Sequence, residues 1–241
     1  MQKQFDYHRT MIAEPDFEQL ARTIGDATRM RMLLLLMDGR ALTAKELAYG
    51  AGVEPATATS HLHRLAGDGL LTVAAQGRHK YFRLASPAVA ALVESMMVLA
   101  PPRRVARAMP DDGIRAARFC YDHLAGRLGT RLTDAMTRDG WLAGGDAGFA
   151  LTGRGGSRLS ALGVDIRAAR RSRRLFAPRC LDWSERTDHL AGSLGAAVAA
   201  RLEALGWVVR QKDSRAVDVT VEGRTALARE FGCSIEDAAA D

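Results

Sequence analysis

Two cysteine–histidine pairs in the second half of the chain have the side chains best suited to hold a metal ion. Cys120 precedes His123 by three residues, a spacing that would place both side chains on one face of a helix. Cys180 and His189 form a second pair. Thiolate and imidazole ligands suit a soft or borderline metal such as zinc, or a thiophilic metalloid. We therefore predict an effector or metal site at these four residues.

The two pairs belong to an internal repeat that must bring them together. Residues 122–126 (DHLAG) recur 66 positions later as residues 188–192, and Gly140-Trp141 recurs as Gly206-Trp207 at the same offset. Two copies are too few for a solenoid, so we expect them to pack against each other, about a pseudo-two-fold axis if the pairs are to converge. The spacing differs, because Cys180 precedes His189 by nine residues. On this basis the two cysteines are not equivalent within the repeat.

Other roles for the same residues remain open. Asp122 and Asp188 suit helix N-caps, both histidines suit buried hydrogen-bonded groups, and both cysteines suit small core residues. A reactive thiol or an organic ligand site is a further alternative. The repeated glycines within the helical patterns indicate either close backbone packing or a ligand against that face.

A second set of polar side chains lies on a predicted helix from Pro55 to Gly69. The preceding segment begins with Thr43 and has Glu46 three residues later, which is capping-box spacing. On the helix, aliphatic residues fall on one side and short polar residues on the other. Two β-prone runs follow, joined by a glycine turn with a basic tip. This order suits a helix in the major groove and a hairpin beside it, and the predicted DNA contacts are Thr57, Thr59, Ser60, His61, Arg64, Arg78 and Lys80.

Residues 24–100 resemble the ArsR/SmtB-type winged helix-turn-helix repressors. The resemblance rests on residues 25–33 (GDATRMRML), 45–48 (KELA), 57–62 (TATSHL), 69–71 (GLL) and 77–84 (GRHKYFRL). It implies a homodimer that represses a promoter and releases it when an inducer binds. It also implies recognition by Thr57, Thr59, Ser60 and His61.

The chain departs from the family where metal-sensing members carry ligands. Residues 47–50 (LAYG) lack the Cys-x-Cys of the first helix of the motif, and residues 86–100 lack the histidines of the helix after the wing. We expect that later helix to form a dimer interface or part of the core. Any inducer must then be sensed elsewhere.

Composition and length favour an α+β protein of several small domains. The chain has 241 residues and a net charge of +6. We expect a winged helix-turn-helix and dimerisation domain at 1–100, a proline-rich linker at 101–112, and repeats at 113–177 and 178–241. The fold class is mainly α with small β-hairpins, with a tandem pair of winged-helix-like repeats after the first domain.

The sequence also indicates where in the cell the protein is located. Residues 1–8 are polar and no apolar run approaches the ~18 residues of a membrane span. With three cysteines, this favours a reducing cytoplasm. A run of arginines over 167–174 suits a solvated face or a phosphate grip. No phosphate loop, nucleophile elbow or HExxH motif is present, so we predict no enzymatic activity.

The sequence therefore predicts a homodimeric DNA-binding regulator, a repressor released from its operator by an effector sensed in the C-terminal repeats. The expected partners are double-stranded DNA, a second copy of the chain and a small effector. Two alternatives remain: a winged-helix module that binds protein and not DNA, and a thiol or metal sensor whose output is a protein partner.

Overall fold

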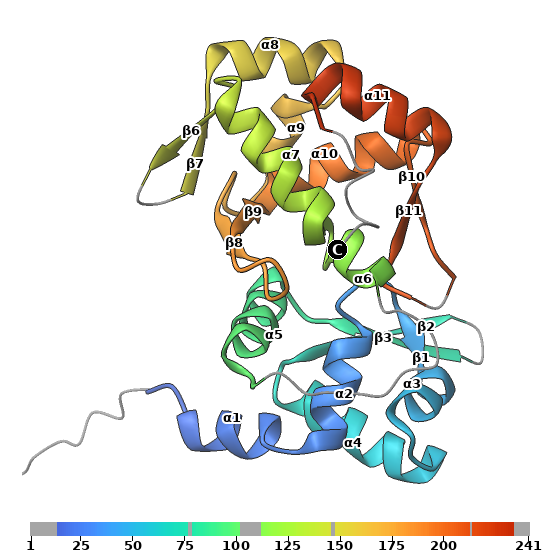
Figure 1. The fold of residues 1–241 in the computed structure, drawn as a ribbon. Coiled ribbons are helices and arrows are strands. Elements are labelled where there is room, and N and C mark those ends of the chain that lie inside the picture. The colour runs from blue at the N-terminus through green and yellow to red at the C-terminus, as the bar shows by residue number, and fades with distance from the viewer. Residues whose placement is uncertain (1–13, 77–78, 102–111, 146–147, 213, 234–241) are drawn as a thin grey trace, which may run out of the picture.

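The computed structural model describes residues 14–76, 79–101, 112–145, 148–212 and 214–233. The two halves of the chain stack on each other, with the N-terminal half below and the C-terminal half above (Figure 1). Most of the expected linker at 101–112 lies outside the described residues. No helix in the described ranges has the length and hydrophobicity that crossing a bilayer requires.

The N-terminal half is a winged helix-turn-helix. Its strands form one antiparallel sheet in the order β1-β3-β2, with β2 and β3 as the wing. Its elements are α1 (Phe17–Ile24), α2 (Ala27–Leu35), β1 (Leu42–Thr43), α3 (Ala44–Ala51), α4 (Pro55–Gly67), β2 (Leu71–Gln76), β3 (His79–Leu84) and α5 (Pro87–Leu99).

Local sequence signals explain the turn between α3 and α4. Thr43 and Glu46 form the predicted capping box at the start of α3. Gly52 ends α3 in the left-handed region at φ +69°, where a side chain would be strained. Pro55 occupies the first turn of α4, where its missing N–H costs no hydrogen bond. Leu62 and Leu65 on α4 then bury their side chains in the core.

The C-terminal half contains the predicted duplication. Each copy runs hairpin, helix, hairpin, helix. The first copy contains β4 (Arg118–Cys120), β5 (His123–Ala125), α7 (Gly126–Arg138), β6 (Leu142–Gly145), β7 (Gly148–Leu151) and α8 (Gly153–Ala161). The second contains β8 (Arg179–Leu181), β9 (Asp188–Leu190), α10 (Gly192–Ala204), β10 (Val208–Arg210), β11 (Val217–Val219) and α11 (Val221–Phe231). The short helices α6 (Asp112–Ala116) and α9 (Ile166–Arg171) precede the first copy and join the two.

The two copies share one hydrophobic core. Helix α7 packs against β9 and α10 packs against β5, so each helix covers the hairpin of the other copy. Close packing explains Gly129 and Gly195, because a Cβ there would lie 2.4 Å and 2.5 Å from the carbonyl oxygens of Leu124 and Leu190. The fold class predicted from the sequence, α+β with small hairpins, is confirmed.

Candidate metal centre and DNA-reading surface

Each of the two short hairpins of the C-terminal half places a cysteine directly opposite a histidine. Cys120 pairs with His123 across β4 and β5, and Cys180 pairs with His189 across β8 and β9. The expectation that Cys120 and His123 share a helix is wrong, because α7 begins only at Gly126. The inequivalence of the cysteines is also wrong. The second hairpin has a longer turn, and strand pairing restores the same Cys–His register.

The hairpins meet so that all four side chains converge. His123 Nε2 lies 3.1 Å from His189 Nε2, and Cys120 Sγ lies 4.0 Å from Cys180 Sγ. One ligand atom from each residue lies within 4.8 Å of the other three. Cys120 and both histidines are buried, whereas Cys180 is half-buried. The four ligand atoms are therefore close enough for one small ion to contact all of them, and Cys180 is the most accessible of the four residues.

A buried ion pair supports His189 from behind. His189 Nδ1 lies 3.4 Å from Asp182 Oδ2, and both side chains are fully buried. Asp182 also receives a hydrogen bond from Arg118 Nη2 at 2.7 Å and another from the Gly126 N–H at 2.7 Å. Burial raises the pKa of the Asp182 carboxyl, but the Arg118 guanidinium, together with hydrogen bonds from the Gly126 N–H and Ser184, outweighs burial and lowers this pKa well below its ordinary value. Asp182 is therefore a permanent carboxylate beside the imidazole.

A second carboxylate supports His123 in the same way. His123 Nδ1 lies 3.4 Å from Asp122 Oδ1. Asp122 in turn pairs with Arg174, which comes from the arginine run. Asp122 is thus not an N-cap, since Ala125 occupies the N-cap position of α7. Asp188 pairs with Arg179, so neither repeated aspartate caps a helix.

Three groups in the cluster, His189, His123 and Cys120, have shifted pKa values. Burial, followed by the charge on His123, lowers the pKa of His189 to about 3. Burial also lowers the pKa of His123, but the Cys120 sulfur and the Asp122 carboxylate outweigh burial and raise it to about 9. The hydrogen bond with Cys180, followed by burial, raises the pKa of the Cys120 thiol. His189 is therefore neutral at pH 7, and its Nε2 can accept a hydrogen bond from the protonated His123 across 3.1 Å.

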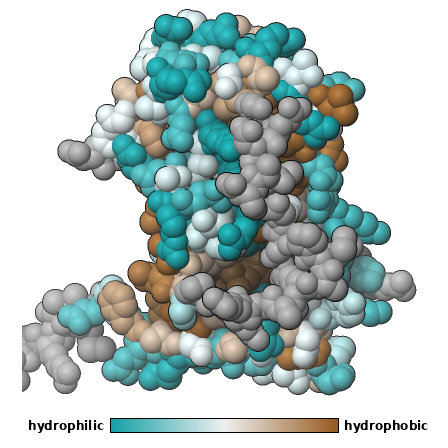
Figure 2. All heavy atoms as spheres, viewed as in Figure 1, coloured by the Kyte–Doolittle hydropathy of each residue, from teal (hydrophilic) through white to brown (hydrophobic). Residues whose placement is uncertain are grey.

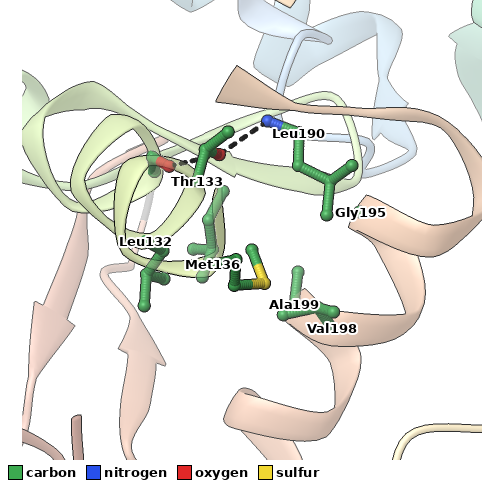
Figure 3. A pocket seen from close by; sticks show the side chains of 9 residues that line it. Leu132, Thr133, Met136, Leu190, Gly195, Val198 and Ala199 are labelled. Atoms are coloured by element: carbon green, nitrogen blue, oxygen red, sulfur yellow. Dashed lines mark hydrogen bonds between the residues drawn. The ribbon is translucent and has the colours of Figure 1, made fainter. Parts of the chain in front are cut away.

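The cluster lies between a small apolar cavity and the N-terminal domain. On the side away from the N-terminal domain, α7 and α10 line a cavity of about 20 Å³ with apolar side chains including Leu132, Met136 and Val198 (Figure 3). That volume is close to the minimum for one water molecule, so no organic ligand fits there. On the other side, Cys120 and Cys180 pack against the core of the winged helix.

The predicted DNA-reading residues separate into two groups. Thr57, Thr59 and Ser60 are exposed on α4, which lies at the end of the molecule away from the C-terminal half (Figure 1). His61 is largely covered and lies 3.7 Å from Asp26 on the α2 N-cap. Arg64 is half-exposed and pairs with Asp68 at 2.8 Å.

The wing and one overlooked residue complete this surface. Lys80 is exposed on β3, and Arg78 lies outside the described residues. His63 was not among the predicted contacts, yet it is exposed on the same face of α4 as Ser60. Its position three residues after Ser60 is the helical spacing that would have indicated it.

The other arginines of the 167–174 run are only partly in contact with solvent. Arg167, Arg171 and Arg173 are exposed. Arg170 stacks over Phe176 at 4.4 Å from the ring centroid. The run therefore divides between solvent, ring stacking and the ion pair behind His123.

Comparison with known proteins agrees with this architecture. A family model described as a helix-turn-helix domain matches residues 24–74. The chain is 37% identical over 224 residues to YdfF of Bacillus subtilis (strain 168), described as an uncharacterized HTH-type transcriptional regulator. That match covers 92% of this chain and 99% of the relative, so the relative shares the duplicated half as well as the winged helix.

Two solved structures match a smaller share of the chain. Reduced HlyU from Vibrio cholerae is 24% identical and covers 35% of this chain and 88% of its own, with a TM-score of 0.32. The homodimeric winged helix-turn-helix domain of Mb0332 from Mycobacterium bovis, described as a possible ArsR-family regulator, is 23% identical. It covers 40% of this chain and all of its own, also with a TM-score of 0.32.

The fold and the matches define a transcriptional regulator with a helix-turn-helix DNA-binding domain. The chain belongs to the family of HTH-type transcriptional regulators that includes YdfF. The recognition of an ArsR/SmtB-type winged helix-turn-helix regulator from the sequence is thereby confirmed for the N-terminal domain.

Proposed function

We propose that the protein is a homodimeric repressor that reads an operator with α4 and the wing and is released by an effector bound in the C-terminal half. The observation that carries this proposal is the outer face of α4. Thr57, Thr59 and Ser60 are exposed on the side opposite the buried leucines, and the Thr59 hydroxyl donates to Pro55 O within the helix. Such donors and acceptors suit base edges and phosphates in a major groove.

Exposed apolar side chains on α1 and α5 support the dimer. Leu99 on α5 is 83% exposed and Phe17 on α1 is 74% exposed. Leu92 and Met96 continue the α5 stripe and are only half-buried. Hydrophobic residues gather at the level of α5, where the two halves of the chain meet (Figure 2). A second copy that covers this stripe would set two α4 helices at the fixed spacing that a two-fold operator requires.

Direct contacts between the cluster and the winged helix support the release step. The turn between β4 and β5 docks on the segment after α2, where the Tyr121 N–H donates to Met37 O at 2.5 Å. Gly39 approaches so closely that a Cβ there would lie 2.6 Å from Tyr121 O. Arg210 Nη1 donates to Asp38 O at 2.8 Å. Because α2 packs on α3 and α4, a shift of this hairpin reaches the DNA-reading helix.

Operator binding tests the proposal directly. A duplex selected from a random pool by the full-length protein serves as the probe in fluorescence anisotropy. We expect Thr57→Ala/Ser60→Ala to bind the selected duplex about tenfold more weakly, because two hydrogen bonds of about 0.5–1.5 kcal/mol each are lost. Thr225→Ala, which removes an exposed hydroxyl from α11, is the control and leaves binding unchanged. A failure to select any sequence, or equal binding by both variants, contradicts the proposal and favours the protein-interaction module.

A further inference from the structure

We propose that Cys120, His123, Cys180 and His189 bind one zinc-class divalent ion in a tetrahedral Cys₂His₂ site. No single hairpin holds the site, since each copy of the repeat contributes one thiol and one imidazole. The binding site rests on its own geometry, whereas the role of this ion as the effector rests on the function proposed above.

The nitrogen–nitrogen and sulfur–sulfur distances fit one tetrahedral ion, and all four ligand atoms lie within 4.8 Å of one another. Zinc lies ~2.0–2.1 Å from histidine nitrogen and ~2.3 Å from cysteine sulfur, so a tetrahedral site has edges of ~3.3 Å between nitrogens and ~3.8 Å between sulfurs. The observed separations are 3.1 Å for the nitrogens and 4.0 Å for the sulfurs. A set of two sulfurs and two nitrogens in this geometry favours zinc over hard cations, which prefer oxygen.

The orientation of the two imidazoles also fits an ion. Both rings direct Nδ1 toward a carboxylate, Asp122 behind His123 and Asp182 behind His189. An N–H on each Nδ1 leaves Nε2 as the atom that each ring offers to an ion, and the two Nε2 atoms face one another across 3.1 Å. A cation that binds between them takes the place of the proton in this contact, since metal ligands must be deprotonated. Carboxylates behind ligating histidines are the usual outer partners of protein zinc sites, where they fix the ring and its tautomer.

The burial of the four ligands fits a site that a metal ion can enter and leave. Cys180 is half-buried, while the other three ligands are buried, so an ion enters past the Cys180 thiol. The neighbouring cavity between α7 and α10 measures only about 20 Å³, so an occupant at this place in the fold would be held by the four ligand atoms. Two thiols suffice for zinc but leave a metalloid that needs three sulfurs under-coordinated.

Bound metal would tie together three parts of the molecule. The two hairpins belong to different copies of the repeat, and both cysteines pack into the core of the winged helix. An ion that draws the two sulfurs toward ~3.8 Å pulls on both hairpins and on the Tyr121 turn docked against Met37. Loading and operator affinity are then linked, because each ligand changes the affinity for the other by the same factor.

Cobalt and zinc titrations of the full-length protein test the site. Reduced protein is freed of metal with a chelator and titrated with Co²⁺, then with Zn²⁺, while visible absorption is recorded. We expect one Co²⁺ per chain with the intense spectrum of tetrahedral thiolate ligation, displaced by one equivalent of Zn²⁺. Cys180→Ser is expected to weaken zinc binding by at least about 100-fold, and Asp122→Asn by about 10- to 100-fold.

Controls separate a binding defect from a folding defect. Cys233→Ser removes a buried thiol that contacts Arg131 O outside the cluster, and it keeps full zinc binding. Cys180 is the least buried ligand, and its variant is checked by circular dichroism. His189→Gln is the second ligand variant and loses tetrahedral cobalt as well. An octahedral cobalt spectrum, unchanged zinc affinity in Cys180→Ser, or a Cys120–Cys180 disulfide that forms with zinc present overturns the site.

Operator binding by the same samples distinguishes this inference from the proposed function. A chain that binds the selected duplex but no zinc refutes the metal site alone. A chain that binds zinc with no change in operator affinity refutes the effector role and leaves the site intact. A change in operator affinity that Cys180→Ser abolishes supports both.

Discussion

The winged helix and the duplicated half combine a helix with an antiparallel hairpin in the same order, yet they bury their helices in opposite ways. Helix α4 buries only one side, at Ala58, Leu62 and Leu65. Helix α7 buries residues around most of its circumference, among them Gly129 and Thr133. The first arrangement leaves a polar face free for DNA. The second uses most of the helix surface to pack one copy on the other.

The two halves also place their polar groups differently. In the winged helix the hydroxyls of α4 face solvent. In the duplicated half the buried polar groups gather at the contact between copies, as an ion pair and two imidazoles. Burying such groups is costly unless they are paired or bind a metal. The duplicated half therefore depends on electrostatic pairing for its fold, and the following predictions test that contrast.

The largest effect is expected from Arg118→Met. The substitution leaves Asp182 as an unpaired buried charge, and breaking such a pair costs about 3–5 kcal/mol of unfolding free energy. All three tryptophans of the chain, Trp141, Trp183 and Trp207, lie in the duplicated half, so denaturant unfolding followed by tryptophan fluorescence reports on this half. Arg229→Ala removes an exposed ion pair with Glu230 and is the control, with an expected cost of about 0–1 kcal/mol. Equal stability of the two variants contradicts the contrast.

A smaller effect is expected from Gly155→Ala on α8. A Cβ at this position would lie 2.2 Å from Trp141 O, whereas one at Gly156 meets nothing within 4 Å. We expect Gly155→Ala to cost about 1–3 kcal/mol through overpacking. Gly156→Ala is expected to raise stability by up to about 1 kcal/mol through helix propensity. The same unfolding measurement applies, and two substitutions of the same sign contradict the close packing between hairpin and helix.

Features set by local sequence were predictable. The capping box at Thr43, the glycine turn and the one-sided pattern of α4 are encoded within a few residues of each other. The repeat was visible because matching residues recur at a fixed offset. The predicted winged-helix-like pattern of each copy follows from the same local signals, and Thr152 and Thr220 cap the last helix of each copy.

The Cys–His hairpins could not be predicted, because distant contacts create them. Tyr121 adopts φ +61°, which is unusual for a bulky residue, and its N–H is held by Met37, far away in the sequence. No local turn signal marks this position. The second turn is longer, which hid the equivalence of Cys120 and Cys180 from an argument based on spacing. The sequence predicted that the four side chains converge only if the two copies pack about a pseudo-two-fold axis.

The smallest effect sharpens the comparison between the wing and its counterpart in the second copy. Lys80 lies on the wing and Lys212 lies in the turn between β10 and β11, and both are exposed. If the wing alone contacts the phosphate backbone, Lys80→Ala lowers the slope of log affinity against log salt by about 1, because one fewer counterion is released. Lys212→Ala leaves that slope unchanged. The measurement is anisotropy with the selected duplex over a series of salt concentrations. A reduced slope for Lys212→Ala would show that the duplicated half also contacts DNA. That result would refute the claim that only the winged helix contacts the phosphate backbone.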